Sequence, residues 1–319
     1  MDLWTSPNYL AILGVISHYI SETGELQQAV LGLLELDGPH SGVNMASSVL
    51  GVIEDYGIAS KVGYFMMDNA ESNDTMIQAI SEELTEQYML NWDPIQHRLR
   101  CNGHIINLTA YAFLFCTLEE ALDDTQNSES IYEIPTEVEM LRWRQKGPLS
   151  KLHNVVVHIQ RSVQRRTEFQ ELSSGLNLTR DNSTRWNSWY TMLKSAMRPK
   201  AQLALKKYCK QHESDIGGDR LLTTDWEDLT HVQSFLRYFF DATKATEGRT
   251  ATIERILPAM DFLLEKFEDG KALYKENPFV GPCINLGWEK LDKYYNLTDR
   301  SPVYIAAMVL CPAIKWGYF

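Results

Sequence analysis

The chain has 319 residues, 44% of them apolar, so it can bury the core of one large domain or two ordinary ones. It contains no run of eighteen apolar residues and no secretory signal pattern, so we expect neither a membrane span nor secretion. Its five cysteines form no CxxC pair, which favours a reducing intracellular compartment over a disulfide framework.

The net charge of −12 is unevenly distributed along the chain. Residues 1–141 carry 3 Lys or Arg against 22 Asp or Glu, whereas residues 142–210 carry 15 against 3. Residues 211–319 return to 12 against 17. A basic block between acidic flanks is typical of a surface for a polyanion, but a solvated helical face gives the same pattern, and charge alone does not separate the two.

The first 67 residues combine strand and helix patterns. Residues 2–6 and 9–20 are β-branched and aromatic runs separated by a Ser-Pro-Asn turn, so they predict a hairpin, and residues 27–36 supply a third strand. A helix follows, with Ser41 as its N-cap. Its apolar face is expected to carry Met45, Val49, Ile53 and Tyr56. Residues 62–67 then form a short apolar strand that runs into Asp68.

The pattern from Asp68 to residue 118 completes an α/β order. A helix marked by Ile77, Ile80 and Leu84, with Asn73 or Asp74 as its cap, is followed by a strand at 97–101 and an apolar helix at 104–115. The order β-β-β-α-β-α-β-α predicts one mixed sheet, antiparallel first and parallel later. The right-handed crossover rule places the fourth strand beside the first, so that Asp2 and Asp68 become neighbours at one edge of the sheet.

The remainder of the chain is expected to be mainly helical. Residues 119–140 form an acidic linker, and residues 141–319 form a helical domain after the catalytic-type region at 1–118. A first amphipathic helix carries Leu149, Leu152, Val156, Ile159 and Val163 on one side and His158, Arg161 and Arg165 on the other. A second helix, over about residues 190–208, is expected to bend at Pro199, and a third is marked by apolar residues from Ile253 to Phe267.

Asp2 and Asp68 are candidate metal ligands. Two carboxylates at adjacent strand ends suit a pair of hard divalent cations, which stabilise the attacking and leaving oxygens of a phosphoryl displacement. The simpler interpretation is a terminal Asp2 and a helix-capping Asp68, and spacing alone favours it.

Four blocks of sequence change that balance: "DLWTSPNYLAILGVISHYI", "GYFMMDNAESNDTMI", "HRLRCNGHIINL" and "STRWNSWYTML". In order and spacing they resemble hAT-superfamily (hobo/Activator-type) DNA transposases, especially fungal members. The resemblance implies an RNase H-like core interrupted by a helical insertion, and DNA strand cleavage and transfer. It implies that Asp2 and Asp68 are the first two residues of a D-D-E triad that holds Mg²⁺ or Mn²⁺.

The resemblance also implies DNA-binding residues. Cys101 and His104 match a C-x-x-H element beside the active site, expected to order that site or touch DNA, although two ligands are too few for structural zinc. Arg161, Arg165 and Arg185 lie in the basic block, and Trp186 matches a residue that holds a flipped base. The alternatives are a packed Cys with a backbone-bonded His, and a Trp that belongs to the core.

The family's third carboxylate, a Glu in a segment like S-E-R-x-F-S, is not recognised, nor are its BED-type zinc finger and C-terminal dimerisation region. We therefore expect a core truncated at both ends, a first strand that is frayed or short at its N-terminus, and little cleavage by this polypeptide alone. The expected partners are DNA, including hairpin or flipped-base intermediates, with no membrane, in the nucleus. The alternative is a non-enzymatic protein, derived from a transposon, that binds nucleic acid or protein.

Overall fold

The computed structural model describes residues 1–6, 8–36, 38, 41–115, 147–181, 185–248 and 252–318. Two compact units are formed, one from Met1–Ile105 with Asn296–Phe319 and one from Ile106–Tyr295. The expected linker at 119–140, with its boundaries at 118 and 141, lies outside the described residues and stays a prediction. No helix within the described ranges is long and apolar enough to cross a bilayer.

Three antiparallel strands begin the first unit: β1 (Asp2–Thr5), β2 (Ala11–Ile20) and β3 (Leu26–Glu35). The predicted hairpin is confirmed, since β1 pairs with β2 along its whole length and Asp2 lies opposite Gly14. A Cβ at Gly14 would lie 3.0 Å from the Trp4 ring, so the missing side chain leaves room for that ring. The first strand was expected to be frayed or short at its N-terminus: β1 is short, with four residues, but it is not frayed, because all four are paired.

A separate parallel pair is formed by β4 (Phe65–Met67) and β5 (Arg98–Arg100). The expected single mixed sheet, with β4 next to β1, is not what the strand ladders show. Instead, the Met1 nitrogen donates a hydrogen bond of 2.9 Å to the Met66 carbonyl oxygen, next to the first residue of β1. Among the described residues, this bond links β1 to β4 without a strand ladder between them.

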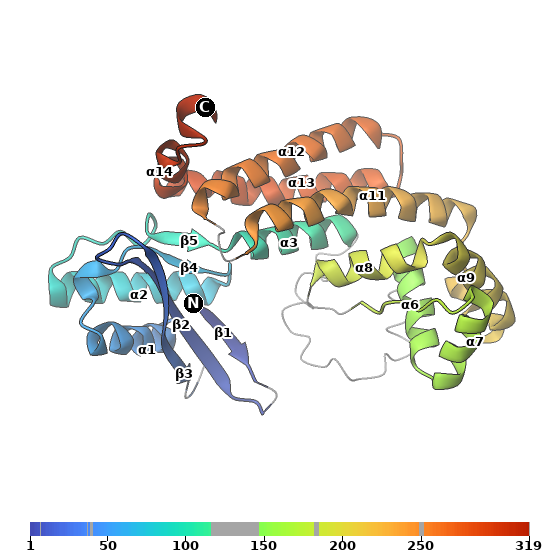
Figure 1. Ribbon diagram of the computed structural model, residues 1–319, viewed down its shortest axis with the longest axis horizontal. Coiled ribbons are helices and arrows are strands. Elements are labelled where there is room, and N and C mark those ends of the chain that lie inside the picture. Colours follow the sequence, from blue (N-terminus) through green and yellow to red (C-terminus); the bar gives the residue numbers. More distant parts are fainter. Residues whose placement is uncertain are drawn as a thin grey trace. The chain divides into compact units, whose positions relative to one another are not determined.

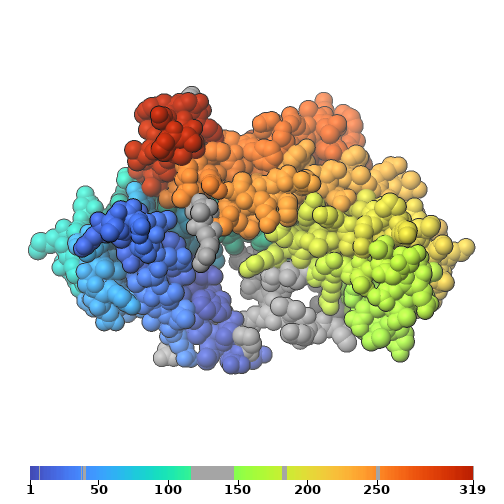
Figure 2. Space-filling view, in the orientation of Figure 1, coloured from blue at the N-terminus to red at the C-terminus, as the bar shows by residue number. Residues whose placement is uncertain are grey.

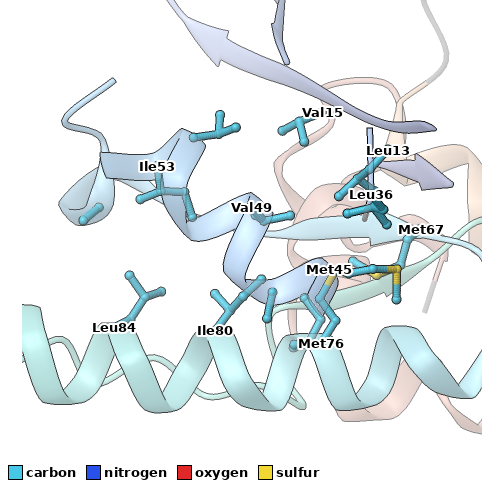
Figure 3. Close-up of a cluster of buried hydrophobic side chains, with 14 of the residues drawn as sticks. Leu13, Val15, Leu36, Met45, Val49, Ile53, Met67, Met76, Ile80 and Leu84 are labelled. Atoms are coloured by element: carbon cyan, nitrogen blue, oxygen red, sulfur yellow. The ribbon is translucent and has the colours of Figure 1, made fainter. Parts of the chain in front are cut away.

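Two helices build the core of this unit, α1 (Gly42–Asp55) and α2 (Glu71–Tyr88) (Figure 1). Figure 3 shows the side chains of α1 between those of β2 and those of α2. The buried set contains Leu13 and Val15 from the sheet, Met45, Val49 and Ile53 from α1, and Met76, Ile80 and Leu84 from α2. The periodicity of apolar residues is thus confirmed except at Tyr56, which ends α1 and is 54% exposed.

The caps of the two helices differ. Ser41 caps α1 as predicted, and its hydroxyl accepts a hydrogen bond from the Asn44 backbone. The prediction for α2 is wrong, because Asn73 and Asp74 lie inside its first turn and Ala70 occupies the cap position. Asp68, two residues ahead of Ala70, accepts a hydrogen bond from the Ala70 backbone N–H, so it orders the turn before α2 and does not cap the helix.

The last described residues return to the first unit. Ser301 Oγ donates a hydrogen bond of 2.6 Å to the Gln96 carbonyl oxygen. The Tyr304 hydroxyl, on α14 (Val303–Leu310), accepts a hydrogen bond of 3.4 Å from the Arg100 backbone. Sequence analysis placed these residues in the helical domain and did not anticipate that they complete the α/β unit.

The second unit is mainly helical, as predicted. Its helices are α6 (Pro148–Gln160), α7 (Val163–Ser173), α8 (Trp186–Ala196), α9 (Pro199–Gln211), α10 (Glu213–Ile216), α11 (Thr223–Thr246), α12 (Ile256–Leu273) and α13 (Val280–Asn296). The helix α3 (Asn102–Leu114) contributes residues to both units. Figure 2 shows the atoms of residues 148–181 and 186–211, coloured green to yellow, packed closely together.

Two details of the helical prediction are corrected. The first helix ends at Gln160, so Val163 starts α7 and is 66% exposed, whereas His158, expected on the polar side, is buried. The second expected helix is two helices, because Pro199 begins α9 instead of bending a continuous one. Proline lacks the N–H that a helix interior needs but is well suited to the first helical position.

Candidate active site and nucleic-acid interface

Asp68 follows β4 directly and is partly buried. Its Oδ1 atom accepts hydrogen bonds from the Ala70 backbone at 3.0 Å and from the Asn73 side-chain amide at 2.6 Å. Among the residues that the structure describes, no hydrogen bond falls on Oδ2. The turn therefore orients the carboxylate through one oxygen and leaves the other for a ligand.

Two arginines of β5 form hydrogen bonds to the same turn. Arg98, only 8% exposed, donates a hydrogen bond of 3.1 Å to the Asp68 carbonyl oxygen and forms an ion pair with Asp74. Arg100 donates a hydrogen bond of 3.1 Å to the Asn69 side-chain oxygen, and its Nη2 atom lies 3.4 Å from Asp74 Oδ1. Burial, and then the charge of Arg100, lower the pKa of Arg98 to about 10, while the Asp68 carboxylate opposes this change.

His104 lies close enough to Asp68 and to Asp2 to interact electrostatically with both. His104 is in the first turn of α3 and is partly buried, and Asp2 is exposed at the start of β1. Burial lowers the pKa of His104, whereas the Asp68 and Asp2 carboxylates raise it, in that order of size. The structure therefore brings together Asp2, Asp68 and His104, which sequence analysis selected separately.

Cys101 joins this group through its backbone. Its N–H donates a hydrogen bond of 2.8 Å to the Met67 carbonyl oxygen, which prolongs the β4–β5 pairing by one residue. The Cys101 thiol, Asp2 and Asp68 all raise the pKa of the Met1 nitrogen, although burial lowers it more. The two residues of the C-x-x-H element thus lie at the same edge as the two carboxylates.

This edge fits a magnesium-type cation through its two carboxylates. Mg²⁺ in proteins is commonly held by one or two carboxylates, with water and substrate phosphates as its remaining ligands. Asp68 Oδ2 and the exposed Asp2 carboxylate match that donor set. Within the part of the chain that the structure describes, the carboxylates that act on the pKa of His104 are these two, whereas the family resemblance implies three.

Three guanidinium groups gather at the end of α6. Arg161 is exposed at the C-terminus of α6, Arg165 is partly buried on α7, and Arg180 is exposed on the segment that follows α7. Burial lowers the pKa of Arg161 most, and the charges of Arg180 and Arg165 lower it further. Mutually repelling guanidinium groups on an exposed surface are a suitable site for phosphate. Sequence analysis missed Arg180, for which the basic block was the only signal.

Arg185 and Trp186 are adjacent in sequence but differ in exposure, because α8 begins at Trp186. Arg185 is the exposed residue that precedes the helix, whereas Trp186 is 2% exposed. The ring centroids of Trp186 and Phe239 lie 5.8 Å apart. The backbone N–H of Trp186 donates a hydrogen bond of 3.1 Å to Asn107 Oδ1. The expected base-stacking role of Trp186 therefore has no exposed ring face here, because α8 turns this ring into the core of the helical unit.

Comparison with known proteins agrees with this architecture. The family model for the ZBED1 RNase-like domain matches residues 1–94, and the model for the ZBED1 RNase-like helical domain matches residues 99–235. The "Putative AC transposase" of Zea mays is 24% identical over 98% of this chain and 35% of its own length. The chain is a hAT-type transposase-like protein.

Other relatives of this hAT-type chain carry different names. "Putative transcriptional regulator tpeD" of Talaromyces stipitatus is 26% identical, and the match covers 100% of this chain and 36% of the relative. "Zinc finger BED domain-containing protein RICESLEEPER 3" of Oryza sativa is 18% identical over 98% of this chain and 38% of its own length. The hAT-type chain thus spans little more than a third of the length of these relatives.

Proposed function

We propose that this chain carries the DNA-binding and part of the DNA-cleaving apparatus of a hAT-type transposase, acting in the nucleus. The observation that carries the proposal is the Asp68 carboxylate at the end of β4, which the Ala70 backbone and the Asn73 side chain orient through Oδ1, within the residues 1–94 that match the RNase-like family model. The names of the relatives support it, since they include a transposase and a transcriptional regulator.

In the proposed site, Asp2 and Asp68 hold Mg²⁺ or Mn²⁺, and the bound cation supplies Lewis-acid stabilisation of phosphate oxygens. Asp68 is the better oriented ligand, because Asn73 and the Ala70 backbone fix its carboxylate. His104 is neutral near pH 7, since its pKa lies below the ordinary value of 6.5. A neutral imidazole at this edge can accept a proton or orient a water molecule beside the DNA backbone.

The basic surface formed by Arg161, Arg165 and Arg180 is proposed to bind DNA phosphates. Such binding is largely independent of sequence and weakens steeply as salt rises. Arg165 is partly engaged within the protein, because it donates to the His158 carbonyl oxygen and lies 3.7 Å from Asp215. We therefore assign the larger share of phosphate binding to Arg161 and Arg180.

The catalytic part of the proposal retains the expectation of weak cleavage. Two carboxylates fix a metal less firmly than three, and a missing ligand lowers the rate of metal-dependent cleavage strongly. DNA binding is accordingly expected to be readily measured, and strand cleavage by this polypeptide alone to be slow.

The test combines binding and nicking with duplex and hairpin DNA. Wild type is expected to bind with a strong salt dependence, and Arg161→Ala with Arg180→Ala should reduce the slope of log K against log salt by roughly 2. Arg237→Ala is the matched control, because Arg237 is an exposed arginine of the same unit that pairs with Asp241. Undetectable binding at low salt contradicts the DNA-binding proposal.

Nicking is assayed with Mg²⁺ or Mn²⁺ on the same DNA. Slow nicking that disappears in Asp68→Ala supports the metal site at the sheet edge. Nicking that survives both Asp2→Ala and Asp68→Ala contradicts it. DNA binding without any nicking in wild type supports the non-enzymatic alternative instead.

A further inference from the structure

A second group of possible metal ligands lies within the helical unit. His158 near the end of α6, His212 directly after α9, and Asp215 in α10 offer ligand atoms that all lie within 4.8 Å of one another. Across the described parts of the chain, this is the set of three such residues that comes together so closely. Neither the sequence pattern nor the proposed DNA-cleaving function uses it.

His158 is already arranged as a metal ligand would be. Its side chain is buried, at 5% exposed, and its Nδ1 atom lies 3.1 Å from the Tyr208 hydroxyl oxygen. Its Nε2 atom makes no hydrogen bond within the described structure, and lies 3.5 Å from Asp215 Oδ2. With the proton on Nδ1 donated to Tyr208, the lone pair of Nε2 points towards Asp215, and metal-binding histidines are usually held by such a second partner.

The other proposed ligands lie near the His158 Nε2 atom and are accessible to solvent. The ring centroids of His158 and His212 are 5.5 Å apart, and His212 Nε2 lies 2.9 Å from Glu168 Oε2. The side chains of His212, Glu168 and Asp215 are 22%, 35% and 47% exposed, so an ion has access from solvent. His212 and Asp215 are three residues apart in one helical turn, which brings two ligands to the same side.

The electrostatic balance of the group favours a cation. Asp215 and Glu168 provide two carboxylates, against the single guanidinium of Arg165 at 3.7 Å from Asp215. Burial lowers the pKa of His158, and Arg165 and His212 lower it further, so its imidazole is neutral near pH 7. A neutral imidazole can bind a metal without first losing a proton.

We propose that His158, His212 and Asp215 bind a divalent transition metal, Zn²⁺ in particular, with Glu168 or water as the fourth ligand. Zinc bonds of about 2.0–2.2 Å in a tetrahedron place neighbouring ligand atoms about 3.3–3.6 Å apart. The distance of 3.5 Å from His158 Nε2 to Asp215 Oδ2 already agrees with that geometry. The partly exposed His212 and Glu168 side chains complete the site by adjusting towards this pair.

The site joins α6 to α7, α9 and α10, and Figure 1 shows α6, α7 and α9 close together. A bound ion therefore stabilises the part of the helical unit that carries Arg161 and Arg165. The simpler interpretation is a set of hydrogen-bonded His–carboxylate pairs that bind no ion. The two interpretations differ in a measurable way, because only the first requires all three side chains for one binding event.

The full chain is stripped with EDTA and then titrated with Zn²⁺ against a chromophoric chelator, and Co²⁺ is used separately for its tetrahedral absorption bands. Wild type is expected to bind Zn²⁺ and to gain thermal stability. His212→Ala and Asp215→Ala should each weaken the affinity at least ~10-fold and abolish the Co²⁺ bands. Both residues are partly or fully exposed, so these variants are expected to fold.

His153→Gln is the matched control, because His153 also lies on α6 and pairs with a carboxylate, Asp181, at 2.8 Å. This control is expected to keep the Zn²⁺ affinity and the Co²⁺ bands of the helical site. The proposal is overturned if wild type binds no Zn²⁺ at micromolar concentration, or if His212→Ala and Asp215→Ala bind it as tightly as wild type.

Discussion

Asn73 donates a hydrogen bond of 2.6 Å from its side-chain amide to Oδ1 of Asp68, across the turn between β4 and α2. The Ala70 backbone donates to the same oxygen. Asp68 thus orders the turn before α2, and it is also the better oriented of the two candidate metal ligands. A single carboxylate therefore couples the stability of the turn to the geometry of the proposed site.

The Asn73–Asp68 bond predicts a clear order of stabilities. Asn73→Ala should lower the free energy of unfolding by about 1–2 kcal/mol, as for a partly exposed hydrogen bond to a charged group. Asn73→Asp should cost more at pH 7, because it places a second negative charge beside Asp68, and the difference should vanish at a pH where the carboxylates are protonated. Urea unfolding measures both.

Asn44→Ala is the control, since Asn44 occupies the same third position in α1. If Asn73→Asp is as stable as Asn73→Ala at pH 7, the two side chains are not in contact in solution.

The grouping of carboxylates around His104 predicts shifts in its titration. Asp68→Asn should lower the pKa of His104 further, because the carboxylate stabilises the imidazolium form, and Asp2→Asn should lower it by less. NMR titration of the imidazole measures both values. Asp55→Asn, a charge change at the end of α1, should leave the pKa unchanged. A pKa that rises or stays constant in Asp68→Asn contradicts the observed geometry.

The His104 imidazole also affects the stability of the protein at acid pH. The folded pKa of His104 lies below the unfolded value of about 6.5, so protonation favours the unfolded chain. Stability linked to His104 is therefore complete above about pH 6.5 and declines as the pH falls towards the folded pKa. Denaturation of His104→Gln compared with wild type across this range should show a smaller decline in the variant.

The burial of Trp186 predicts a defect in folding rather than in DNA binding. Trp186→Ala should cost about 3–5 kcal/mol, as for a large aromatic side chain removed from a core. Trp186→Phe should keep the affinity for hairpin DNA at fixed salt. Trp316→Ala is the control, because Trp316 is 71% exposed and its removal should change stability by less than about 0.5 kcal/mol. A stable Trp186→Phe protein with lost hairpin affinity would return this residue to the DNA interface.

Two glycines of α1 predict opposite effects of the same substitution. A Cβ at Gly42 would lie 2.4 Å from the Ser72 carbonyl oxygen and 2.6 Å from Thr75 Cβ, whereas nothing lies within 4 Å of a Cβ at Gly51. Gly42→Ala should therefore destabilise the first unit by about 1–3 kcal/mol. Gly51→Ala should stabilise it by about 0.5–1 kcal/mol, because alanine favours a helix interior. Thermal unfolding of both variants tests the close contact of α1 with α2.

Local patterns in the sequence predicted much of the first unit. The Ser-Pro-Asn turn and the flanking apolar runs predicted the β1–β2 hairpin, and Ser41 was recognised as a cap because its partner is three residues away. The prediction for the cap of α2 was wrong because Asn73 and Asp74 lie inside the first turn, and Ala70 at the cap position has no side-chain acceptor. Helical periodicity likewise placed His158 on the polar side, since it treated residues on both sides of the break at 161–162 as one helix.

Contacts between distant residues could not be predicted in this way. The bond from Ser301 to Gln96 joins residues 205 positions apart, and no local pattern marks either partner. The candidate site is an intermediate case. The sequence placed Asp2 beside Asp68 through a single mixed sheet, but β1 and β4 belong to separate sheets, and His104 is the residue that lies near both carboxylates. The cluster of His158, His212 and Asp215 depends on how three helices pack. Arg180 lay within the basic block without any feature that distinguished it from its neighbours.

The return of the chain at Ser301 also determines when the first unit can be completed during synthesis. Roughly 190 residues of the second unit are translated between the two segments of the first. At about 5–20 residues per second, β5 waits roughly 10–40 s for Ser301 and Tyr304 to emerge. During that time the polar groups of Gln96 and Arg100 that later bind them face solvent or a chaperone, so the helical unit has time to fold first.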